Sequence, residues 1–392
     1  MLLHDERHDQ PSSAPPLDRV LALLQRWGEH ATSFQILESG YVYWFDAEVE
    51  AVVAYVEVGR HRVVAGPPVT APEHVGAVVG RFVADCRRAR QRAVFFSADD
   101  VFVARLRESA AAPAFDQLYI GQQPEFDPDT WSWDGPEHRT LRAQCRRAER
   151  KVTVRRVAAS VVSDVASAER RGMEAVIRAW KAHRHMGVMR FMVDVQPFAF
   201  TAERRYWVAE RDGAIVALLV AVPVYQRQGW FLEDVIRRPV APNGTAELLI
   251  HSALAEAQAQ GDTYVTLGLA PLADVPAGPG PHRLWRGTFR LCARELGYLY
   301  GFEGLVRFKR RFRPHRWSAQ YVVVSPPRVG LLAMGAVLEA FAGRSLVGFG
   351  VETARRLMPR VPRWFYPVLV LWATVVGAGG LALLHWLGGW PM

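Results

Sequence analysis

Residues 229–272 constrain the fold of this chain more than any other stretch. An apolar run at 230–236 contains two adjacent carboxylates and is followed by arginine, which is typical of a buried strand whose end reaches a site. A Pro-Asn-Gly turn follows, and helical spacing of apolar residues begins at Thr245, which we expect to be the N-cap. Residues 264–267 are a second predicted strand. Strand, helix and parallel strand form a crossover unit, and its turn presents backbone N–H groups to an anionic or carbonyl group.

The first third of the chain contains a degenerate copy of this unit. Residues 41–45 and 51–58 are predicted strands, residues 73–90 a helix and residues 93–96 a strand, with a turn at Gly66. The order and spacing match those of the later unit, so the sequence predicts a tandem of two α/β units. This arrangement resembles the acetyltransferase-like (GNAT) fold, in which the crossover is the centre of the active site.

Composition and charge limit the class of protein. A chain of 392 residues with 50% hydrophobic and 22% charged residues is a globular protein with room for two domains and further segments. The net charge of +9 indicates an anionic partner such as RNA or acidic lipid. The three cysteines are far apart without paired spacing, so we expect reduced thiols, no metal site and no bound cofactor.

Changes in composition predict the domain boundaries. Residues 1–16 are polar and rich in Pro and Ser, so we expect a disordered tail without a signal peptide. The first GNAT-like domain covers residues 17–127, and a linker rich in Asp, Pro and Trp covers residues 128–136. The second GNAT-like domain, which we expect to be catalytic, covers residues 137–325. Residues 326–363 are predicted to be a juxtamembrane amphipathic segment.

The C-terminus is predicted to be anchored in a membrane. Residues 364–390 contain no Asp, Glu, Lys or Arg and are long enough to span ~30 Å of hydrocarbon. Arg355, Arg356, Arg360 and Arg363 precede this run and no charge follows it, so the positive-inside rule places the folded domains in the cytoplasm. A buried core helix is the alternative interpretation, and the bounding arginines and aromatic residues favour the membrane.

Two basic clusters bracket the second domain. The predicted helix at 137–151 places Arg139, Arg142, Arg146 and Arg150 on one face. The second cluster, near the other end of the domain, consists of Arg307, Lys309, Arg310, Arg311, Arg313 and Arg316. The helix face is suited to a tRNA backbone or to anionic lipid headgroups, and a solvated surface helix is the alternative. Two clusters around one site favour an anionic substrate.

Asp234 and Arg237 lie three positions apart at the end of the central predicted strand. Strict alternation would place them on opposite faces, so both reach one crevice only if the strand end twists or bulges. Asp234 is then a candidate for holding an amino group or accepting a hydroxyl proton, and Arg237 for binding a phosphate bidentately. A structural ion pair is the alternative. Gly-x-Ser-x-Gly is absent, so no covalent enzyme intermediate is indicated.

Several segments resemble the catalytic domain of the lysylphosphatidylglycerol synthases, in the same order along the chain. These segments are Ser33-Phe-Gln-Ile-Leu37 with residues 41–45, Glu233-Asp234-Val-Ile-Arg237, Leu267-Gly268-Leu-Ala-Pro271-Leu272 and Phe308-Lys309-Arg-Arg-Phe312. Such enzymes move an amino acid from aminoacyl-tRNA onto a hydroxyl of phosphatidylglycerol. The resemblance covers roughly residues 17–324. It implies a tandem GNAT-like aminoacyltransferase at the bacterial inner membrane, with aminoacyl-tRNA and an anionic phospholipid as partners.

The resemblance also assigns roles to individual residues. Asp234 and Arg237 match the family's Asp-x-x-Arg pair, which is implicated in substrate binding. Lys309 matches the Lys of its Phe-Lys-x-x-Phe motif, where it would neutralise a lipid or tRNA phosphate. Further candidates for substrate binding are Glu233, Asn243, Gly244, Gly268, Trp180, Lys181 and Arg311. A plain turn also explains the Asn-Gly pair, and a core Trp beside a solvent-facing Lys explains the Trp-Lys pair.

Two features depart from the family pattern. Family members often carry a large N-terminal multi-helix membrane domain that flips the product, and nothing like it is found in this sequence, so flipping is not implied. Residues 190–194 differ from the Gly-ending aromatic segment expected after the Trp-Lys pair, which leaves the transferred amino acid and the acyl donor open. An acyltransferase that uses an acyl thioester and a non-catalytic scaffold that binds anionic lipid or RNA are the alternative functions.

Overall fold

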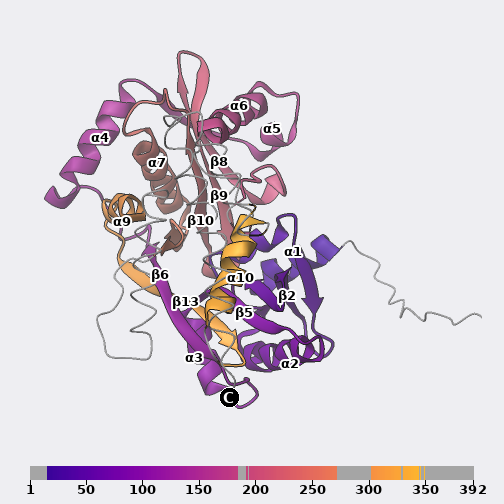
Figure 1. Ribbon diagram of the computed structural model, residues 1–392. Helices are drawn as coiled ribbons and strands as arrows, with labels where there is room; N and C mark the ends of the chain where they lie inside the picture. Colours follow the sequence, from indigo (N-terminus) through magenta and orange to yellow (C-terminus); the bar gives the residue numbers. More distant parts are fainter. Residues whose placement is uncertain are drawn as a thin grey trace, which may run out of the picture.

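A computed structural model describes residues 16–183, 191–192, 194–271, 302–327, 330–343, 345 and 348. The strands of this part of the molecule form one mixed sheet of 13 strands. Figure 1 shows the sheet running through the molecule with helices packed around it. The strand order is β1-β2-β3-β5-β13-β6-β11-β10-β9-β8-β7, while β4 pairs with β2 and β12 pairs with β6.

The strands divide into two groups along the chain. The first group consists of β1 (Val42–Phe45), β2 (Ala51–Val58), β3 (His61–Ala65), β4 (Val69–Thr70), β5 (Arg92–Asp99) and β6 (Asp116–Phe126). The second group consists of β7 (Thr153–Val157), β8 (Arg205–Arg211), β9 (Ala214–Val224), β10 (Gly229–Arg237), β11 (Tyr264–Thr266), β12 (Ala270–Pro271) and β13 (Arg316–Ser325).

Helices cover both faces of this sheet. The described α-helices are α1 (Pro16–Trp27), α2 (Val75–Arg88), α3 (Asp100–Glu108), α4 (Arg139–Glu149), α5 (Ala159–Ser163), α6 (Ala168–His183), α7 (Thr245–Gln260), α9 (Phe302–Arg310) and α10 (Leu331–Ala342). Short 3-10 helices are η1 (Ser33–Leu37), η2 (Pro72–His74), η3 (Pro136–His138), η4 (Thr201–Glu203) and η5 (Tyr225–Arg227). The apolar clusters place α2, α3, α4 and α7 on one face and α1, α5, α6 and α10 on the other.

The central crossover unit is confirmed. Strand β10 pairs in parallel with β11, and α7 connects the two strands and packs on β9 and β10. The predicted N-cap is wrong by one residue, because Gly244 holds that position with φ of +93°. Glycine adopts this conformation without strain, and a Cβ there would lie 2.3 Å from the carbonyl oxygen of Gln144 in α4. Thr245 begins the helix, and its hydroxyl donates to the Pro242 carbonyl at 2.7 Å.

The same arrangement occurs in the first half of the chain. Strand β3 pairs in parallel with β5, and α2 connects the two. The predicted strands at 41–45 and 51–58 are confirmed as the antiparallel pair β1 and β2. However, the strand that enters the crossover is β3, which the sequence analysis missed because its buried run of five residues begins with His-Arg. Each crossover therefore follows an antiparallel set of strands.

The two groups of strands are joined by an exchange at the middle of the sheet. The late strand β13 pairs antiparallel with both β5 and β6, which come from the first half of the chain. Strand β6 in turn pairs with β11 and β12 of the second half. The predicted linker at 128–136 packs on the second half, since the indole of Trp131 donates to the Phe312 carbonyl at 2.7 Å.

Several predicted segments lie partly or wholly outside the described residues. They are the tail at 1–16 except its last residue, most of the second half of the juxtamembrane segment predicted at 326–363, and the anchor at 364–390. In the described ranges, no helix combines the length and the apolar character that a membrane span requires.

Candidate active site

A β-bulge in β10 shapes the site. Leu232 pairs with Ala221 of β9 and Asp234 pairs with Val220, so Glu233 is an extra residue between two consecutive partners. The bulge turns the side chains of Glu233 and Asp234 to the same face of the sheet, the face covered by α5, α6 and α10. Two adjacent carboxylates therefore point into one region, where regular alternation would have separated them.

Arg204, just before β8, forms an ion pair with one of these carboxylates. Its guanidinium donates to Oε2 of Glu233 at 2.6 Å, and the two side chains are 1% and 7% exposed. A second donor of Arg204 holds the Ala199 carbonyl at 2.9 Å. Glu233 Oε1 and Asp234 Oδ2 are buried and have no hydrogen-bond partner among the described residues. Such buried acceptors carry a desolvation cost unless a ligand pairs with them.

Two further carboxyl groups from distant segments complete an acidic cluster. Glu38 follows η1 and is buried, and Asp194 lies in the loop after α6. Burial and the neighbouring Glu233 raise the pKa of Glu38 to about 10. The same two causes raise the pKa of Asp234 to about 8, against the opposing effect of Arg204 and Lys181. We call Glu38, Asp194, Glu233 and Asp234 the acidic cluster. The raised pKa values of Glu38 and Asp234 mean that burial and the neighbouring carboxylate favour the neutral, protonated form of each group.

Hydrogen bonds between the two halves hold the acidic cluster together. Gln196 donates to Asp194 Oδ2 and to Ser39 Oγ, both at 2.9 Å, and its own Oε1 accepts from the Ser39 N–H at 3.2 Å. The Tyr41 hydroxyl accepts the Met192 N–H at 3.2 Å. The loop after α6 is therefore fastened to the segment that carries Glu38, and the site exists only where both halves meet.

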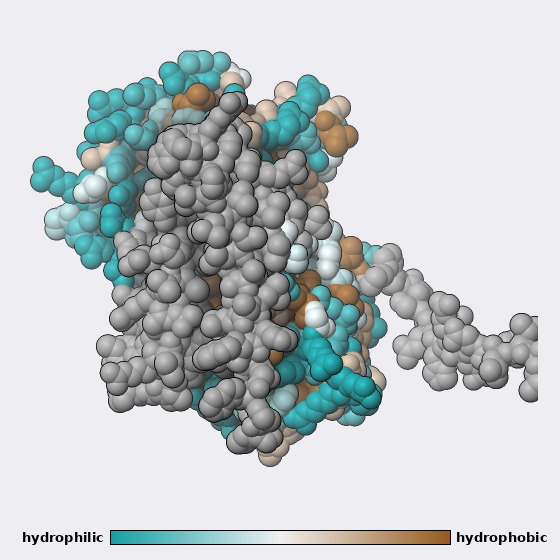
Figure 2. Space-filling model, viewed as in Figure 1, coloured by the Kyte–Doolittle hydropathy of each residue, from teal (hydrophilic) through white to brown (hydrophobic). Residues whose placement is uncertain are grey.

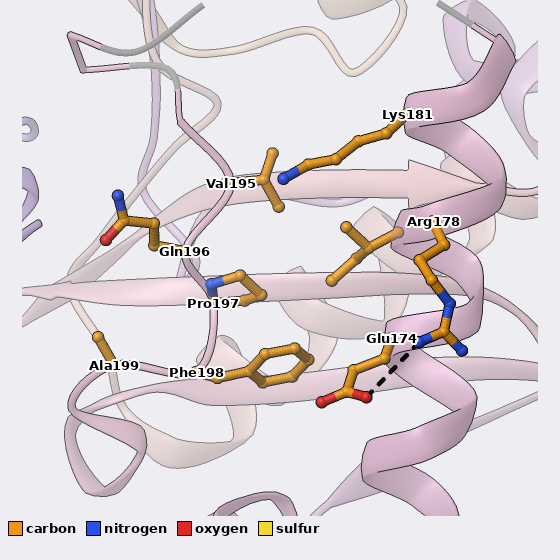
Figure 3. Close-up of a pocket in the computed structure, with 9 residues that line it drawn as sticks. Glu174, Arg178, Lys181, Val195, Gln196, Pro197, Phe198 and Ala199 are labelled. Atoms are coloured by element: carbon orange, nitrogen blue, oxygen red, sulfur yellow. Dashed lines mark ion pairs between the residues drawn. The ribbon is translucent and has the colours of Figure 1, made fainter. Parts of the chain in front are cut away.

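A cavity of about 740 Å³ adjoins the acidic cluster. Its walls include Glu38, Asp194, Lys181, Phe191 and Tyr41, together with the β2–β3 turn and the end of α10. Lys181 also lines a smaller cavity of about 390 Å³. Figure 3 shows the Lys181 side chain extending from α6 across this smaller cavity toward Val195. The structure thus brings Lys181 to the acidic cluster. Trp180 of α6 is half-buried and packs against the apolar cluster under this helix.

Arg237 does not share the crevice with Asp234. After the bulge the alternation of β10 is regular, so Asp234 and Arg237 lie on opposite faces of the sheet. Arg237 pairs with Ala217 and is exposed on the α7 face, where Val235 packs. The expectation that both side chains reach one crevice is therefore wrong, because the bulge precedes Asp234 and does not fall between the two residues.

The Lys309 side chain binds backbone carbonyls in this conformation. Its buried ammonium donates to three successive carbonyls, those of Leu267, Gly268 and Leu269, at 2.7, 2.9 and 2.8 Å. Burial lowers the pKa of Lys309 to about 7. All three N–H donors are in use, so none is left for the predicted contact with a phosphate. Gly268 has φ of +71°, and a Cβ there would lie 2.5 Å from the Phe231 ring, which explains glycine without a ligand.

The N-terminus of α7, which the sequence analysis predicted to bind an anion or a carbonyl, is covered. Helix α4 approaches it at Gly244, and Thr245 is fully buried. Arg311 donates to Gln144 of α4 at 3.3 Å and to Glu247 in the first turn of α7 at 3.4 Å. Among the residues predicted here, the structure leaves Asn243 exposed at the turn.

The two basic clusters meet on the α7 face of the molecule. Arg139, Arg146 and Arg150 of the α4 segment are exposed, whereas Arg142 donates to the carbonyls of Trp133 and Gly135. The exposed arginines of the second cluster are Arg307, Arg310, Arg313 and Arg316. Figure 2 shows the surface over α4 as largely hydrophilic. We call these exposed arginines the basic face, which lies across the sheet from the acidic cluster.

Three residues of the site, Glu38, Asp194 and Arg204, were not among the residues predicted from sequence patterns. Glu38 directly follows the segment 33–37, which carried part of the family resemblance, and this position was the available signal. Asp194 lies in the loop that was noted only as a departure from the family pattern. In the described part of the chain, no three His, Cys, Asp or Glu side chains are arranged to hold a metal ion.

Solved structures with the same fold are known. The structure of L-PGS from Bacillus licheniformis has a TM-score of 0.70 and 20% identity, and the match covers 87% of this chain and 99% of that chain. The C-terminal domain of a putative lysylphosphatidylglycerol synthetase from Agrobacterium fabrum has a TM-score of 0.68 and 22% identity, with 83% and 96% coverage. At these identities the comparison shows the fold.

Sequence relatives identify the family. The phosphatidylglycerol lysyltransferase of Bacillus subtilis (strain 168) is 24% identical over 308 residues, which are 78% of this chain and 34% of that protein. The lysylphosphatidylglycerol biosynthesis bifunctional protein LysX of Mycobacterium avium (strain 104) is 31% identical over 159 residues, which are 37% of this chain and 13% of that protein. The chain thus spans about a third or less of the length of these relatives. Residues 21–324 match the model of the family described as "Phosphatidylglycerol lysyltransferase, C-terminal", and the chain belongs to this family.

Proposed function

We propose that this protein is an aminoacyltransferase that moves a cationic amino acid from aminoacyl-tRNA to a hydroxyl of phosphatidylglycerol. Lysine is the amino acid that we expect. The observation that carries the proposal is the acidic cluster, in which carboxyl groups from three distant segments influence one another, and two of them, Glu38 and Asp194, line the cavity of about 740 Å³. The names of the sequence relatives supply the reaction type. The negative charge of the acidic cluster is the reason to expect that the transferred amino acid is cationic.

The charge of the acidic cluster matches a lysyl ester. Four carboxylates face two resident cations, Arg204 and Lys181, so the fully ionised site lacks two positive charges. A lysyl ester carries an α-ammonium and an ε-ammonium group. Binding both would pair the carboxylate oxygens that have no partner among the described residues and would lower the raised pKa values of Glu38 and Asp234.

The reaction needs no further reactant. The hydroxyl oxygen of the lipid attacks the carbonyl carbon of the aminoacyl ester, and the bond between this carbon and the ribose oxygen breaks. The lipid hydroxyl loses its proton, and the ribose hydroxyl regains one. One ester is exchanged for another. In this proposal the acidic cluster fixes the amino acid, so that its carbonyl is held near the acceptor hydroxyl.

The basic face is the proposed contact surface for tRNA. Its exposed arginines lie on α4 and around α9. Arginines on an open surface bind the phosphate backbone of a nucleic acid and do not read its bases. We also keep the predicted C-terminal membrane anchor and the cytoplasmic position of the folded part in the proposal. The arginines before residue 364 and the uncharged run after them support both.

We further infer that both crossovers are GNAT-like units. The repeated order of antiparallel strands, helix and parallel strand supports this assignment. An acyl-thioester donor was the alternative for the crossover turn, and α4 fills the space that such a donor would need at Gly244. The aminoacyl-tRNA proposal is therefore preferred over the thioester alternative.

The test is mass spectrometry of lipids after incubation of the full chain with phosphatidylglycerol vesicles and tRNA charged with lysine or alanine. We expect a lysyl-phosphatidylglycerol product from wild type, and at least about a 100-fold loss for Asp234→Asn, in the range of a lost charged contact at a reacting centre. Glu38→Gln should lower the preference for lysine over alanine, because it removes one carboxylate from the cluster.

Asp212→Asn is the matched control. This aspartate has the same chemistry but lies in the exposed turn between β8 and β9, where the φ of 52° suits asparagine equally well. It should retain full activity. Undiminished product from Asp234→Asn would refute the site, and binding of acyl thioester without use of charged tRNA would refute the donor.

A further inference from the structure

We propose that Tyr41 is a catalytic residue whose hydroxyl donates a hydrogen bond to the carbonyl oxygen of the aminoacyl ester while the acceptor hydroxyl attacks. This inference rests on the proposed function and adds to it the group that stabilises the charge on that oxygen. Exchange of one ester for another passes through a tetrahedral intermediate, in which the carbonyl oxygen becomes an oxyanion. A donor fixed beside this oxygen stabilises the intermediate more than the planar ester.

Other side-chain donors around the acidic cluster are already in use. Lys309 spends its three N–H donors on backbone carbonyls. The buried guanidinium of Arg204 holds Glu233 and a further backbone carbonyl. The side-chain amide of Gln196 donates to two oxygens at once. The donor for an oxyanion therefore has to come from another residue that lines the cavity of about 740 Å³.

Apart from carboxyl groups, four described residues of the cavity wall carry a side-chain donor. They are Ser39, Tyr41, Lys181 and Ser345. The two serines are exposed. The Lys181 ammonium opposes the rise in the pKa of Asp234 and thus acts as a counter-ion of the acidic cluster. Tyr41 is the remaining donor, and it is neutral and half-buried.

The Tyr41 hydroxyl can still donate a hydrogen bond. Its oxygen accepts the N–H of Met192 at 3.2 Å, and no described residue accepts its hydrogen. A phenol oxygen that accepts one bond keeps its O–H for a second, and hydrogen bonds in such a chain strengthen one another. Burial and the neighbouring Glu38 raise the pKa of Tyr41 well above its ordinary value, so the hydroxyl keeps its proton at neutral pH.

The surrounding structure fixes the position of this hydroxyl. Tyr41 directly precedes β1, and its ring lies 5.9 Å from the ring of Phe191, which also lines the cavity. Met192, which holds the hydroxyl oxygen, is itself bound through its carbonyl to the Gln35 side chain at 3.0 Å. Because the ring and the oxygen are both held, the donor needs no reorganisation during the reaction.

The proposed step requires no proton from Tyr41. When the acceptor oxygen attacks the carbonyl carbon, the second electron pair of the C=O bond moves to the carbonyl oxygen, which accepts the hydrogen bond. When the intermediate collapses, this pair returns and the ribose oxygen leaves with its bonding electrons and gains a proton. The two ammonium groups of a lysyl ester, with Arg204 and Lys181, balance the four carboxylates, so no uncompensated charge repels the oxyanion.

The first test compares Tyr41→Phe with the matched control Tyr43→Phe in the full chain. Both changes remove one hydroxyl and keep the ring, but the Tyr43 hydroxyl donates to the Ile36 carbonyl at 2.6 Å and is no part of the described cavity wall. With lysyl-tRNA and phosphatidylglycerol vesicles, Tyr41→Phe should lower kcat by about 100-fold and leave KM for lysyl-tRNA within about twofold. Tyr43→Phe should keep the kcat and the KM of wild type.

The second test separates this role from a loss of the bond to Met192. Lysine N-methylamide has a planar carbonyl, whereas a lysine analogue with a phosphonate methyl ester in place of its carboxyl group has the shape and charge of the tetrahedral intermediate. Calorimetric titration should show that Tyr41→Phe binds the phosphonate about 100-fold more weakly than wild type and the amide within about threefold. A displaced loop after α6 would instead move Asp194 and weaken both.

An equal loss of affinity for both analogues would overturn the proposal, because Tyr41 would then only position the loop. Unchanged kcat in Tyr41→Phe, or the same loss in Tyr43→Phe, would also overturn it. If wild type forms no product from any charged tRNA, the proposed function fails, and the two analogues still decide the role of Tyr41. A loss confined to the phosphonate would then support the oxyanion donor, and a phosphonate that does not bind wild type would refute it.

Discussion

At the scale of single residues, the acidic cluster is an unfavourable arrangement that the fold maintains. Asp234 has a buried oxygen without a partner among the described residues, and burial together with Glu233 raises its pKa from 3.8 to about 8. Groups of this kind cost stability and are typical of sites that gain their partner from a ligand. The site should therefore become more stable when its charge is removed.

Asp234→Asn should stabilise the protein in a way that depends on pH. Between pH 4 and pH 8 the folded state holds a proton that the unfolded state releases, so the free energy of unfolding of wild type falls as the pH rises through this window. Asparagine does not titrate, so the free energy of unfolding of the variant lacks this pH-dependent contribution. At pH 8 the variant should melt at least about 2 °C higher, which corresponds to about 1.6 kcal/mol for 392 residues at an unfolding entropy of ~2.1 cal/mol/K per residue.

Thermal melting by circular dichroism at pH 8 and near pH 4.5 measures this difference. The gain in melting temperature should shrink at the lower pH. There Asp234 is protonated in the folded protein and is uncharged, as asparagine is. Asp212→Asn should leave both melting temperatures unchanged. A gain that is equal at the two pH values would show that the raised pKa is not its cause.

At the scale of elements, α4 combines a structural and a binding role on different sides. Leu141, Cys145 and Ala148 are buried against α7, while Arg139 and Arg146 are exposed. The sequence placed four arginines on one face, and the structure commits Arg142 to the carbonyls of the 128–136 segment. The remaining exposed arginines can be removed without touching the core.

A triple variant tests the basic face: Arg139→Gln/Arg146→Gln/Arg150→Gln. It should weaken the binding of every tRNA to the same extent, whatever the nucleotide sequence. Each lost phosphate contact lowers the slope of log K against log salt by about 0.9, so the slope should fall by roughly 2 to 3. KM for aminoacyl-tRNA should rise, and kcat should change little because the acidic cluster lies on the other face of the sheet. Filter binding at several salt concentrations and steady-state kinetics give the two readouts.

The matched control removes three exposed arginines at the end of α2, Arg87, Arg88 and Arg90, which carry the same charge. The control variant should bind tRNA as wild type does. An identical loss in both triple variants would show that net charge, and not the basic face, governs binding.

At the scale of the whole molecule, the exchange of β6 and β13 makes the two halves interdependent. Strand β13 lies between β5 and β6, so the sheet of the first half is completed by residues near position 320. The acidic cluster needs the same union, since Glu38 comes from one half and Asp194, Glu233 and Asp234 from the other. We therefore expect one cooperative unit.

Val323→Ala tests this expectation. Val323 in β13 is 1% exposed and packs with α2 and α3, so the substitution should cost about 1–3 kcal/mol through the lost contacts and the resulting cavity. Calorimetry should show a single transition that moves to lower temperature. Hydrogen exchange should accelerate in β2 and β3 and also in β9 and β10, as expected for one foldon.

Val101→Ala is the control for this change, because Val101 is the same residue type at an exposed position of α3. It should alter neither transition nor exchange. Accelerated exchange confined to the first group of strands would contradict the single unit and would support two independent domains.

The elements that local sequence patterns could predict are those whose evidence lies within a few residues. The spacing of Leu248, Leu249 and Leu254 predicts the buried side of α7, and the glycines at 244 and 261 mark its ends. The predictions for β1, β2 and β10 hold for the same reason, since apolar runs and turn residues are local signals. Strand β3 was not predicted because its buried run begins with the polar pair His-Arg.

The sequence by itself determined the crossovers, the basic helix and the family, because periodicity, caps and motifs are written in neighbouring residues. Only the tertiary structure decided which charges meet. Glu38, Asp194 and Arg204 approach β10 across gaps of many residues in sequence, and a single extra residue in β10 turns Glu233 to the side of Asp234 and leaves Arg237 on the other face. Strand register and burial, which set these positions and their pKa values, arise from contacts between distant segments, and no local pattern encodes them.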